Sequence, residues 1–449
     1  MRRASWMRGA IAGLALLLAP ARASANTVLD LPHILELADR NHPNVAAARA
    51  RLLQARAQLD EAHFAPFSQF QLTGGVAIAP QLLGNNVFSP NTDVSLSSSL
   101  GVAWRAGIDG VLPLWTFGKI TNLWDAASAN VKVVEADVEK ERDAVRVDVR
   151  KAFFGLQLAR DSLGLLQDVK RQLEKGRTHM QEAVKKDAGD PVDLAKLETY
   201  AAEVDVRESE ALRYVDVALS GLRFYTGVAD LDIPATPLQP PRHQLGHVTR
   251  YLTAAGLYRP EIQMARAGVA ARRAQVEMAR AELFPNIGLG VQVGLSAAPE
   301  IADQLNPFVT DPGNFFHYGA AIVFQWKLDF LPQAARIRFA EAQLDEVRSQ
   351  QRFALGGVGA EVEVAYAEVL DWEKRVAIYA KAVKSAKKWL IMIQQGIELG
   401  TREDKDLLEP AKAYALNKYQ ELNAVMELDM AMSRLAKATG WDAIAPDGM

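Results

Sequence analysis

The chain contains one long sequence unit twice. A single shift that places Phe117 on Phe330 superposes the two copies without a gap over 117–227. We therefore predict two structural repeats, at 26–228 and 251–441, joined by a connector at 229–250 where four prolines stand within eight residues. Two units cannot stack into a capped solenoid, so the repeats form one pseudo-duplicated domain. The same shift places Asp193 on Asp406, Leu222 on Leu435 and Gly227 on Gly440.

Residues 1–25 have the three zones of a secretory signal peptide. A basic start is followed by an apolar run at 9–18 and by small residues at 23–25. This apolar run is about half as long as a helix that crosses a bilayer. We expect residues 1–25 to be removed on export, and residues 442–449 to form a C-terminal tail.

Composition excludes several classes of protein. Loss of 1–25 removes four arginines and no acid, which leaves a net charge of −7 and disfavours a nucleic-acid partner. The absence of cysteine excludes a disulfide framework, a thiol enzyme and a lipid anchor on an N-terminal cysteine. No apolar run after the signal is long enough to span a bilayer as a helix, so a membrane-spanning part would have to be a β-barrel.

Four segments alternate apolar residues with small or polar ones, which predicts strands with one apolar face. This pattern fits a soluble sandwich as well as a lipid-facing barrel wall. Aromatic residues near the strand ends, and loops at about 80–93 and 297–314 rich in Pro, Asn and Asp, favour the barrel. The aromatic residues are Trp104, Trp115, Phe316, Tyr318, Phe324 and Trp326. The apolar positions include Phe70, Leu72, Val76 and Ile78; Val94, Leu96, Leu100, Val102 and Ile108; Ile287, Leu289, Val291, Val293 and Leu295; and Ile322 and Leu328.

Four strands are too few to close a membrane barrel, since the smallest have about eight. The missing strands must come from other copies of the chain. We predict an α+β fold that assembles as a homotrimer, in which four strands per chain give a 12-stranded β-barrel in contact with outer-membrane lipid.

Each repeat continues into a long helix and a returning helix. Residues 119–186 contain no proline and place apolar or small residues three or four apart, which predicts a coiled-coil seam about 100 Å long. Pro191 begins the returning helix, and residues 333–399 repeat the design. Three copies of two hairpins would make a 12-helix α-barrel continuous with the strands. Long seam helices alone also fit a periplasmic scaffold.

Three motifs, in this order, resemble those of the TolC-like outer-membrane efflux proteins, also called outer membrane factors. They are Asn41-His42-Pro43, the strand exit at 112–119 and the closing segment at 435–440. The resemblance covers nearly the whole mature chain. It implies a trimeric exit duct of a tripartite efflux or type I secretion system, which extends from the cell outer membrane into the periplasm and works with a periplasmic adaptor protein and an inner-membrane pump.

The segment 396–409 resembles the tip of the family's inner hairpin. The resemblance implies that Asp406 and Glu409 form an acidic ring at the periplasmic entrance, and that Arg402 holds the tip closed, with Asp193 as a possible partner. Acids three residues apart also share one face of a helix. Without the family, the same stretch reads as an exposed, solvated tip. Ile397 stands where the family often has an aromatic residue, so one closing contact is expected to be missing.

The sequence contains no nucleophile motif and no metal-ligand pattern, so we predict no enzyme, cofactor or metal site. The alternative function is a non-transporting periplasmic coiled-coil scaffold or adaptor. Drugs, metals and secreted proteins all remain open as exported substrates.

Overall fold

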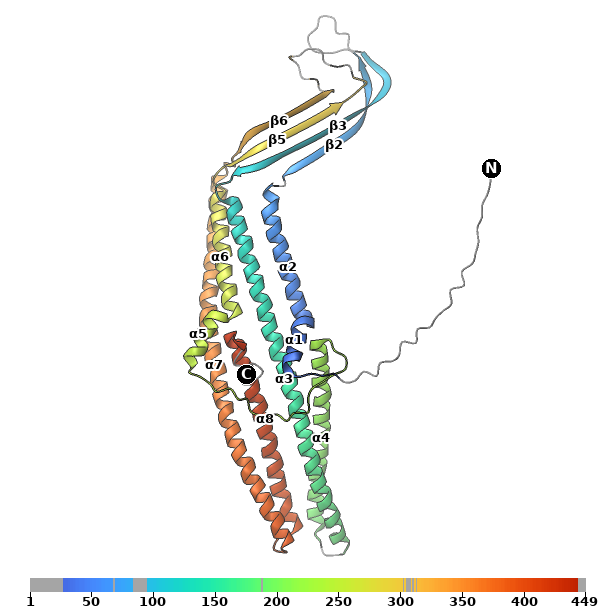
Figure 1. The fold of residues 1–449 in the computed structure, drawn as a ribbon, viewed down its shortest axis with the longest axis vertical. Coiled ribbons are helices and arrows are strands. Elements are labelled where there is room, and N and C mark those ends of the chain that lie inside the picture. The colour runs from blue at the N-terminus through green and yellow to red at the C-terminus, as the bar shows by residue number, and fades with distance from the viewer. Residues whose placement is uncertain are drawn as a thin grey trace, which may run out of the picture.

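The computed structural model describes residues 27–442 except 68, 84–94, 187–188, 302, 304–307, 309–310 and 312. The predicted signal peptide, Val94, residues 443–449 of the predicted tail and parts of both predicted outer loops lie outside this described part. The molecule is elongated, with a sheet at one end and two helical hairpins at the other (Figure 1).

The two repeats have the same order of elements. The first repeat consists of α1 (Leu31–Asn41), α2 (Pro43–Phe64), β2 (Phe70–Leu83), β3 (Ser95–Trp115), α3 (Lys119–Lys185) and α4 (Pro191–Thr226). The second consists of α5 (Val248–Tyr258), α6 (Pro260–Ala281), β5 (Asn286–Ala297), β6 (Phe315–Gln325), α7 (Phe330–Glu398) and α8 (Leu408–Thr439). Short elements complete the chain: β1 (Thr27–Val28) pairs in parallel with β4 (Leu231–Asp232), and η1 (Ala65–Phe67) and η2 (Asp404–Leu407) are 3-10 turns.

Backbone geometry is also repeated between the two halves of the chain. Gly227 and Gly440 end α4 and α8 with φ of 72° and 64°, the left-handed conformation that glycine adopts without strain. Each repeat opens on two helices, broken before Pro43 and Pro260. The preceding residues, His42 and Arg259, are extended because a following proline disfavours the helical conformation.

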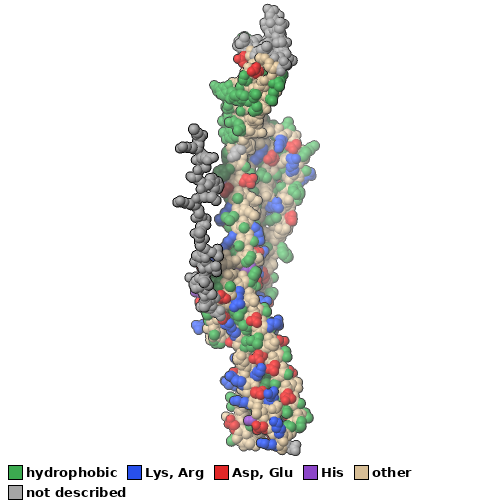
Figure 2. All heavy atoms as spheres, turned by 90° about the vertical axis from the view of Figure 1, so that its right-hand side faces the viewer, with side chains coloured by type: hydrophobic (Ala, Val, Ile, Leu, Met, Phe, Trp, Pro, Cys, Tyr) green, Lys and Arg blue, Asp and Glu red, His purple; other side chains and the backbone are tan. Residues whose placement is uncertain are grey.

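The sheet is antiparallel in the order β2-β3-β5-β6, and its register confirms the predicted alternation. Ile108 lies opposite Leu72 and Val293, and Val293 lies opposite Tyr318, so one row of apolar side chains crosses all four strands. Leu72 and Tyr318 are 74% and 78% exposed. The other face is small and polar, as where Asp109 stands opposite Gln71 and Gln292. Figure 2 shows hydrophobic side chains gathered over the sheet and charged ones spread along the helices.

The helices form two rows that share α3 and α7. Near the sheet, α3 packs against α2 and α6, and α6 packs against α7. Toward the hairpin tips, α3 packs against α4 and α8, and α8 packs against α7. The outer helices are therefore α2 and α7 near the sheet, and α4 and α7 near the tips (Figure 1).

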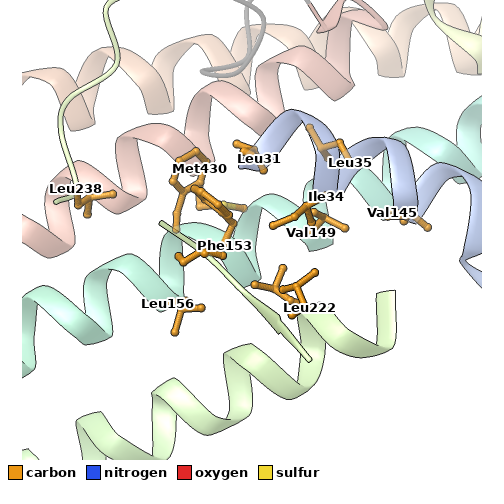
Figure 3. Close-up of a cluster of buried hydrophobic side chains, with 14 of the residues drawn as sticks. Leu31, Ile34, Leu35, Val145, Val149, Phe153, Leu156, Leu222, Leu238 and Met430 are labelled. Carbon is orange, nitrogen blue, oxygen red and sulfur yellow. The ribbon is translucent and has the colours of Figure 1, made fainter. Parts of the chain in front are cut away.

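The hydrophobic core lies at the middle of the helical part. Ile34, Val149 and Leu222 from α1, α3 and α4 have no exposed surface and pack together (Figure 3). A second cluster in the other repeat centres on Val362 and Leu435. Burying each such side chain stabilises the fold by about 2 kcal/mol. Among the described residues, no helix is both long enough and apolar enough to cross a membrane.

Candidate functional site

The turn between α7 and α8 is built around two glycines. Gly400 has φ 69°, and the Gly396 carbonyl accepts hydrogen bonds from the backbone N–H groups of Thr401 (2.8 Å) and Arg402 (3.1 Å). A Cβ on Gly396 would lie 2.7 Å from Cγ of Arg402. These glycines let the chain reverse tightly and bring Arg402 against the last turn of α7.

The predicted acids fall in two different elements. Asp406 belongs to the 3-10 turn η2, where its carboxylate accepts a hydrogen bond from the Glu403 backbone N–H at 3.3 Å. Glu409 is in the first turn of α8, where an acid is favoured by the helix dipole. The two acids therefore do not share one face of a single helix as expected. Asp406 lies in a 3-10 turn, and Glu409 lies in the helix that follows it.

Asp193, Asp406 and Glu409 nonetheless line one cavity, of about 420 Å³, between the two hairpins. Its remaining walls are largely apolar and come from α3, α4, η2 and α8. They include Val169, Leu173, Met180, Leu197, Leu407 and Leu408, with Lys196 and Lys405 among the charged residues. The structure therefore gathers three of the four predicted site residues from hairpins that belong to different repeats.

Arg402 does not line this cavity. Its Nη1 lies 4.0 Å from Oδ2 of Asp406, with more than half of its side chain exposed. Asp193 accepts a hydrogen bond from Nζ of Lys196 at 3.0 Å. Within one chain, the described contacts of Arg402 and Asp193 are with these other partners, and their mutual pairing stays a prediction.

Lys405 is a site residue that the sequence reasoning did not single out. Its Nζ donates to the Glu403 carboxylate at 2.7 Å. This hydrogen bond raises the pKa of Lys405, and the charges of Glu403, Asp193 and Asp406 add to the effect. A cation thus stands among the acids at the tip. Its position between Glu403 and Asp406 in sequence was the available signal.

Tyr200 marks where the two hairpins meet above the cavity. Nζ of Lys412 on α8 lies 5.3 Å from the centre of the Tyr200 ring on α4 and 4.0 Å from the Glu203 carboxylate. Burial raises the pKa of Tyr200, as do the charges of Glu203 and Glu409. The phenol therefore stays neutral beside these carboxylates.

A second set of contacts ties the sheet to the helices. Lys119 Nζ, at the start of α3, donates to the Phe284 carbonyl (2.9 Å) and to Oδ1 of Asn286 (2.7 Å), across the entry to β5. Burial lowers the pKa of Lys119. Phe117, with φ 54°, stacks on Phe284 with ring centres 5.2 Å apart. These contacts fasten the junction between β3 and α3 to the junction between α6 and β5.

Two tryptophans fasten the other junctions. The indole N–H of Trp124 donates to the Ala62 carbonyl at 2.8 Å, and that of Trp326 to the Leu283 carbonyl at 3.0 Å. Trp326 was predicted only as an interfacial aromatic residue, and Trp124 was not predicted. The part of the chain that the structure describes holds no group of three or more His, Cys, Asp or Glu residues arranged for a metal ion.

Comparisons with known proteins agree with this architecture. The model of the outer membrane efflux protein family matches residues 34–228 and 252–441. The outer-membrane channel OprN is similar with a TM-score of 0.74 at 17% identity, over 91% of this chain and 89% of that one. A membrane protein from Pseudomonas aeruginosa is similar with a TM-score of 0.74 at 20% identity, over 97% of this chain and 98% of that one. The open state of the Neisseria gonorrhoeae MtrE outer membrane channel is similar with a TM-score of 0.74 at 17% identity, over 93% of this chain and 90% of that one. At these identities the likeness concerns the fold. No curated protein sequence matches the chain.

Proposed function

The chain belongs to the outer membrane efflux protein family, and we propose that three copies form the exit duct of a tripartite efflux or type I secretion system. Its place is the outer membrane, with the helical part extending into the periplasm. In this proposal residues 26–228 and 251–441 are the two repeats of each subunit, and 229–250 connects them.

One observation carries the proposal: the antiparallel sheet has one continuous apolar face and two edges, β2 and β6, without a neighbour in the described chain. An exposed strand edge and an exposed apolar face are both costly in water. Pairing β6 of one copy with β2 of the next covers both edges, and three copies close twelve strands. Lipid then covers the apolar face.

Aromatic residues support this placement in the membrane. Trp115 and Phe324 lie opposite Ile287 at the helix end of the sheet, and Phe316 lies opposite Leu295 farther out. Eight residues of strand span about 27 Å, or about 20 Å along the membrane normal at the usual barrel tilt. This separation suits two aromatic girdles flanking an apolar band.

Exposed apolar side chains on the outer helices also support closure of a cylinder by neighbouring copies. The outer helix α7 exposes Phe339 (66%) and Phe353 (82%), and α2 on the opposite edge exposes Leu53 (65%). Four helices per chain at each level give a 12-helix cylinder. Its walls continue from the strands through the junctions fastened by Lys119 and Trp124.

At the far end of the cylinder, we assign Asp406 and Glu409 to an acidic ring that narrows the entrance, and Arg402 and Asp193 to contacts that close it. Three copies bring six carboxylates around one axis, which attracts cations. The hairpin tips are where a periplasmic adaptor protein and, through it, an inner-membrane pump would dock.

Conductance across a planar bilayer tests the duct. Purified protein should form trimers that conduct ions, with block by multivalent cations added on the tip side. The paired change Asp406→Asn and Glu409→Gln should weaken that block. Glu398→Gln, an exposed acid at the end of α7 outside the tip cavity, should leave it unchanged.

Extraction separates the duct from a periplasmic scaffold. A scaffold would leave the cells with the soluble periplasmic fraction and would not conduct. If the trimer conducts ions but the paired variant is still fully blocked by multivalent cations, only the assignment of Asp406 and Glu409 to an acidic ring is wrong.

A further inference from the structure

The lower half of α7 carries a row of lysines that the proposed duct leaves unused. Lys374, Lys381 and Lys388 stand seven residues apart, and all three are exposed. No ion pair of theirs is recorded among the described residues. Beside them Ile378 and Met392 are 62% and 58% exposed. Apolar residues flanked by cations at heptad spacing are typical of a coiled-coil seam, here on a helix with an unpartnered side.

The opposite edge of the chain, α4, carries acids at the same spacing. Glu203 and Glu210 are seven residues apart, with side chains 60% and 44% exposed. Their neighbours Val206 and Val217 are 60% and 58% exposed. Glu203 and Glu210 have partners within the chain, Lys412 and Arg207, but exposed pairs of this kind contribute little.

The two rows lie at the same height above the tips. Glu203 reaches Lys412 of α8, and the neighbours of Lys412 share a cavity of about 670 Å³ with α7. Lys388 is therefore level with Glu203. The cavity residues that set this height are Ala411 and Tyr414 from α8, and Lys387, Leu390, Ile391 and Gln394 from α7.

The match continues away from the tips. Residue numbers fall along α7 and rise along α4 in that direction, and seven residues of helix span about 10 Å. Lys381 therefore comes level with Glu210, and Lys374 with Val217.

We propose that α7 of one copy packs antiparallel against α4 of the next copy, with Lys388 facing Glu203 and Lys381 facing Glu210, and with Lys374 beside the exposed Val217. This charged seam sets the register of the helical cylinder near its tips. The inference rests on the proposed trimer. It adds which surfaces meet and at what height, continuous with the pairing of β6 to β2 at the other end.

The same charges disfavour neighbouring registers. A slip of one heptad toward the tip of α4 would place Lys388 opposite Lys196, which stands seven residues before Glu203. The opposite slip would place Lys381 opposite Val217 and leave its charge without a partner. Like charges face to face are destabilising, and only the proposed register places both Lys388 and Lys381 opposite an acid.

Cross-linking tests the register, because the chain has no cysteine of its own. The double variant Lys381→Cys with Glu210→Cys should yield cross-linked dimers and trimers with a short bismaleimide. The matched control, Lys381→Cys with Glu203→Cys, displaces one site by about 10 Å and should give little product. Equal yields from both pairs in a trimeric protein would overturn the seam.

Charge reversal tests its energetics. Lys381→Glu with Lys388→Glu affects six pairs in a trimer, and at about twofold each this weakens assembly on the order of fiftyfold at low salt. Adding Glu203→Lys and Glu210→Lys should restore assembly, measured by light scattering in detergent. If these two changes do not restore assembly, the charged seam is wrong, but the proposed trimer is unaffected. A wild-type protein that is monomeric overturns both the seam and the duct.

Discussion

Asp429 should make the stability of this protein fall as the pH rises through neutrality. It lies on α8 with 2% of its surface exposed, between the two main hydrophobic clusters, and no ion pair of its carboxylate is recorded among the described residues. Burial raises the pKa of Asp429 from 3.8 to about 8. The carboxyl is therefore neutral in the folded chain at pH 7 and ionised in the unfolded chain.

The sign and size follow from proton linkage. Below pH 3.8 the carboxyl is protonated in both states and costs nothing. Between 3.8 and about 8 only the folded chain holds the proton, so the free energy of unfolding falls by about 1.4 kcal/mol per pH unit. Raising the pH from 6 to 8 should thus cost about 2 kcal/mol per chain. For a chain of this size that is about 2 to 3 °C in Tm.

The change Asp429→Asn removes this proton while keeping the shape of the side chain. We expect the Tm of the variant, measured in detergent by scanning calorimetry, to rise relative to wild type as the pH goes from 6 to 8. Taking the difference cancels every other titrating group. Asp216→Asn, an exposed aspartate on α4, is the control and should show a constant difference. A Tm gap for Asp429→Asn that does not change with pH would refute the reasoning.

Three further changes probe other parts of the chain. Gly400→Ala places a side chain at φ 69° in the tip turn and should cost about 1 kcal/mol, seen as faster proteolysis of the tip. Lys119→Met removes two charge-assisted hydrogen bonds, to Phe284 and Asn286, and should lower the free energy of unfolding by about 3 kcal/mol in denaturant titrations. Burial lowers the pKa of His42, which caps α2 as a neutral ring, so its contribution is complete above 6.5 and is lost as the pH falls below that value. His42→Asn keeps a capping side chain, and its thermal stability should change less between pH 7 and 5 than that of wild type.

Patterns confined to one segment predicted most of the fold. Alternation along Phe70–Leu83 and heptad spacing along Lys119–Lys185 are local, and each element lies within a few residues of its predicted place. The break at His42 shows the same locality, since proline restricts only the residue before it. Contacts between distant segments were not predictable in this way. The bond from Trp124 to Ala62 joins two helices on either side of a pair of strands, and neither residue type alone indicates a partner.

At the tip, the repeat shift already aligned Asp193 with Asp406, which predicts equivalent places on two hairpins but not proximity. Proximity arises because α4 and α8 both pack against α3, so that the equivalent acids converge on one cavity. The same packing places Lys405 among them, and a cation there offsets part of the repulsion between carboxylates that a closed entrance would create. In the proposed duct, separation of the hairpin tips would move Lys405 away with η2 and leave Asp193 with Lys196 alone. The charge on the first hairpin should then favour a basic partner more strongly in the open duct than in the closed one.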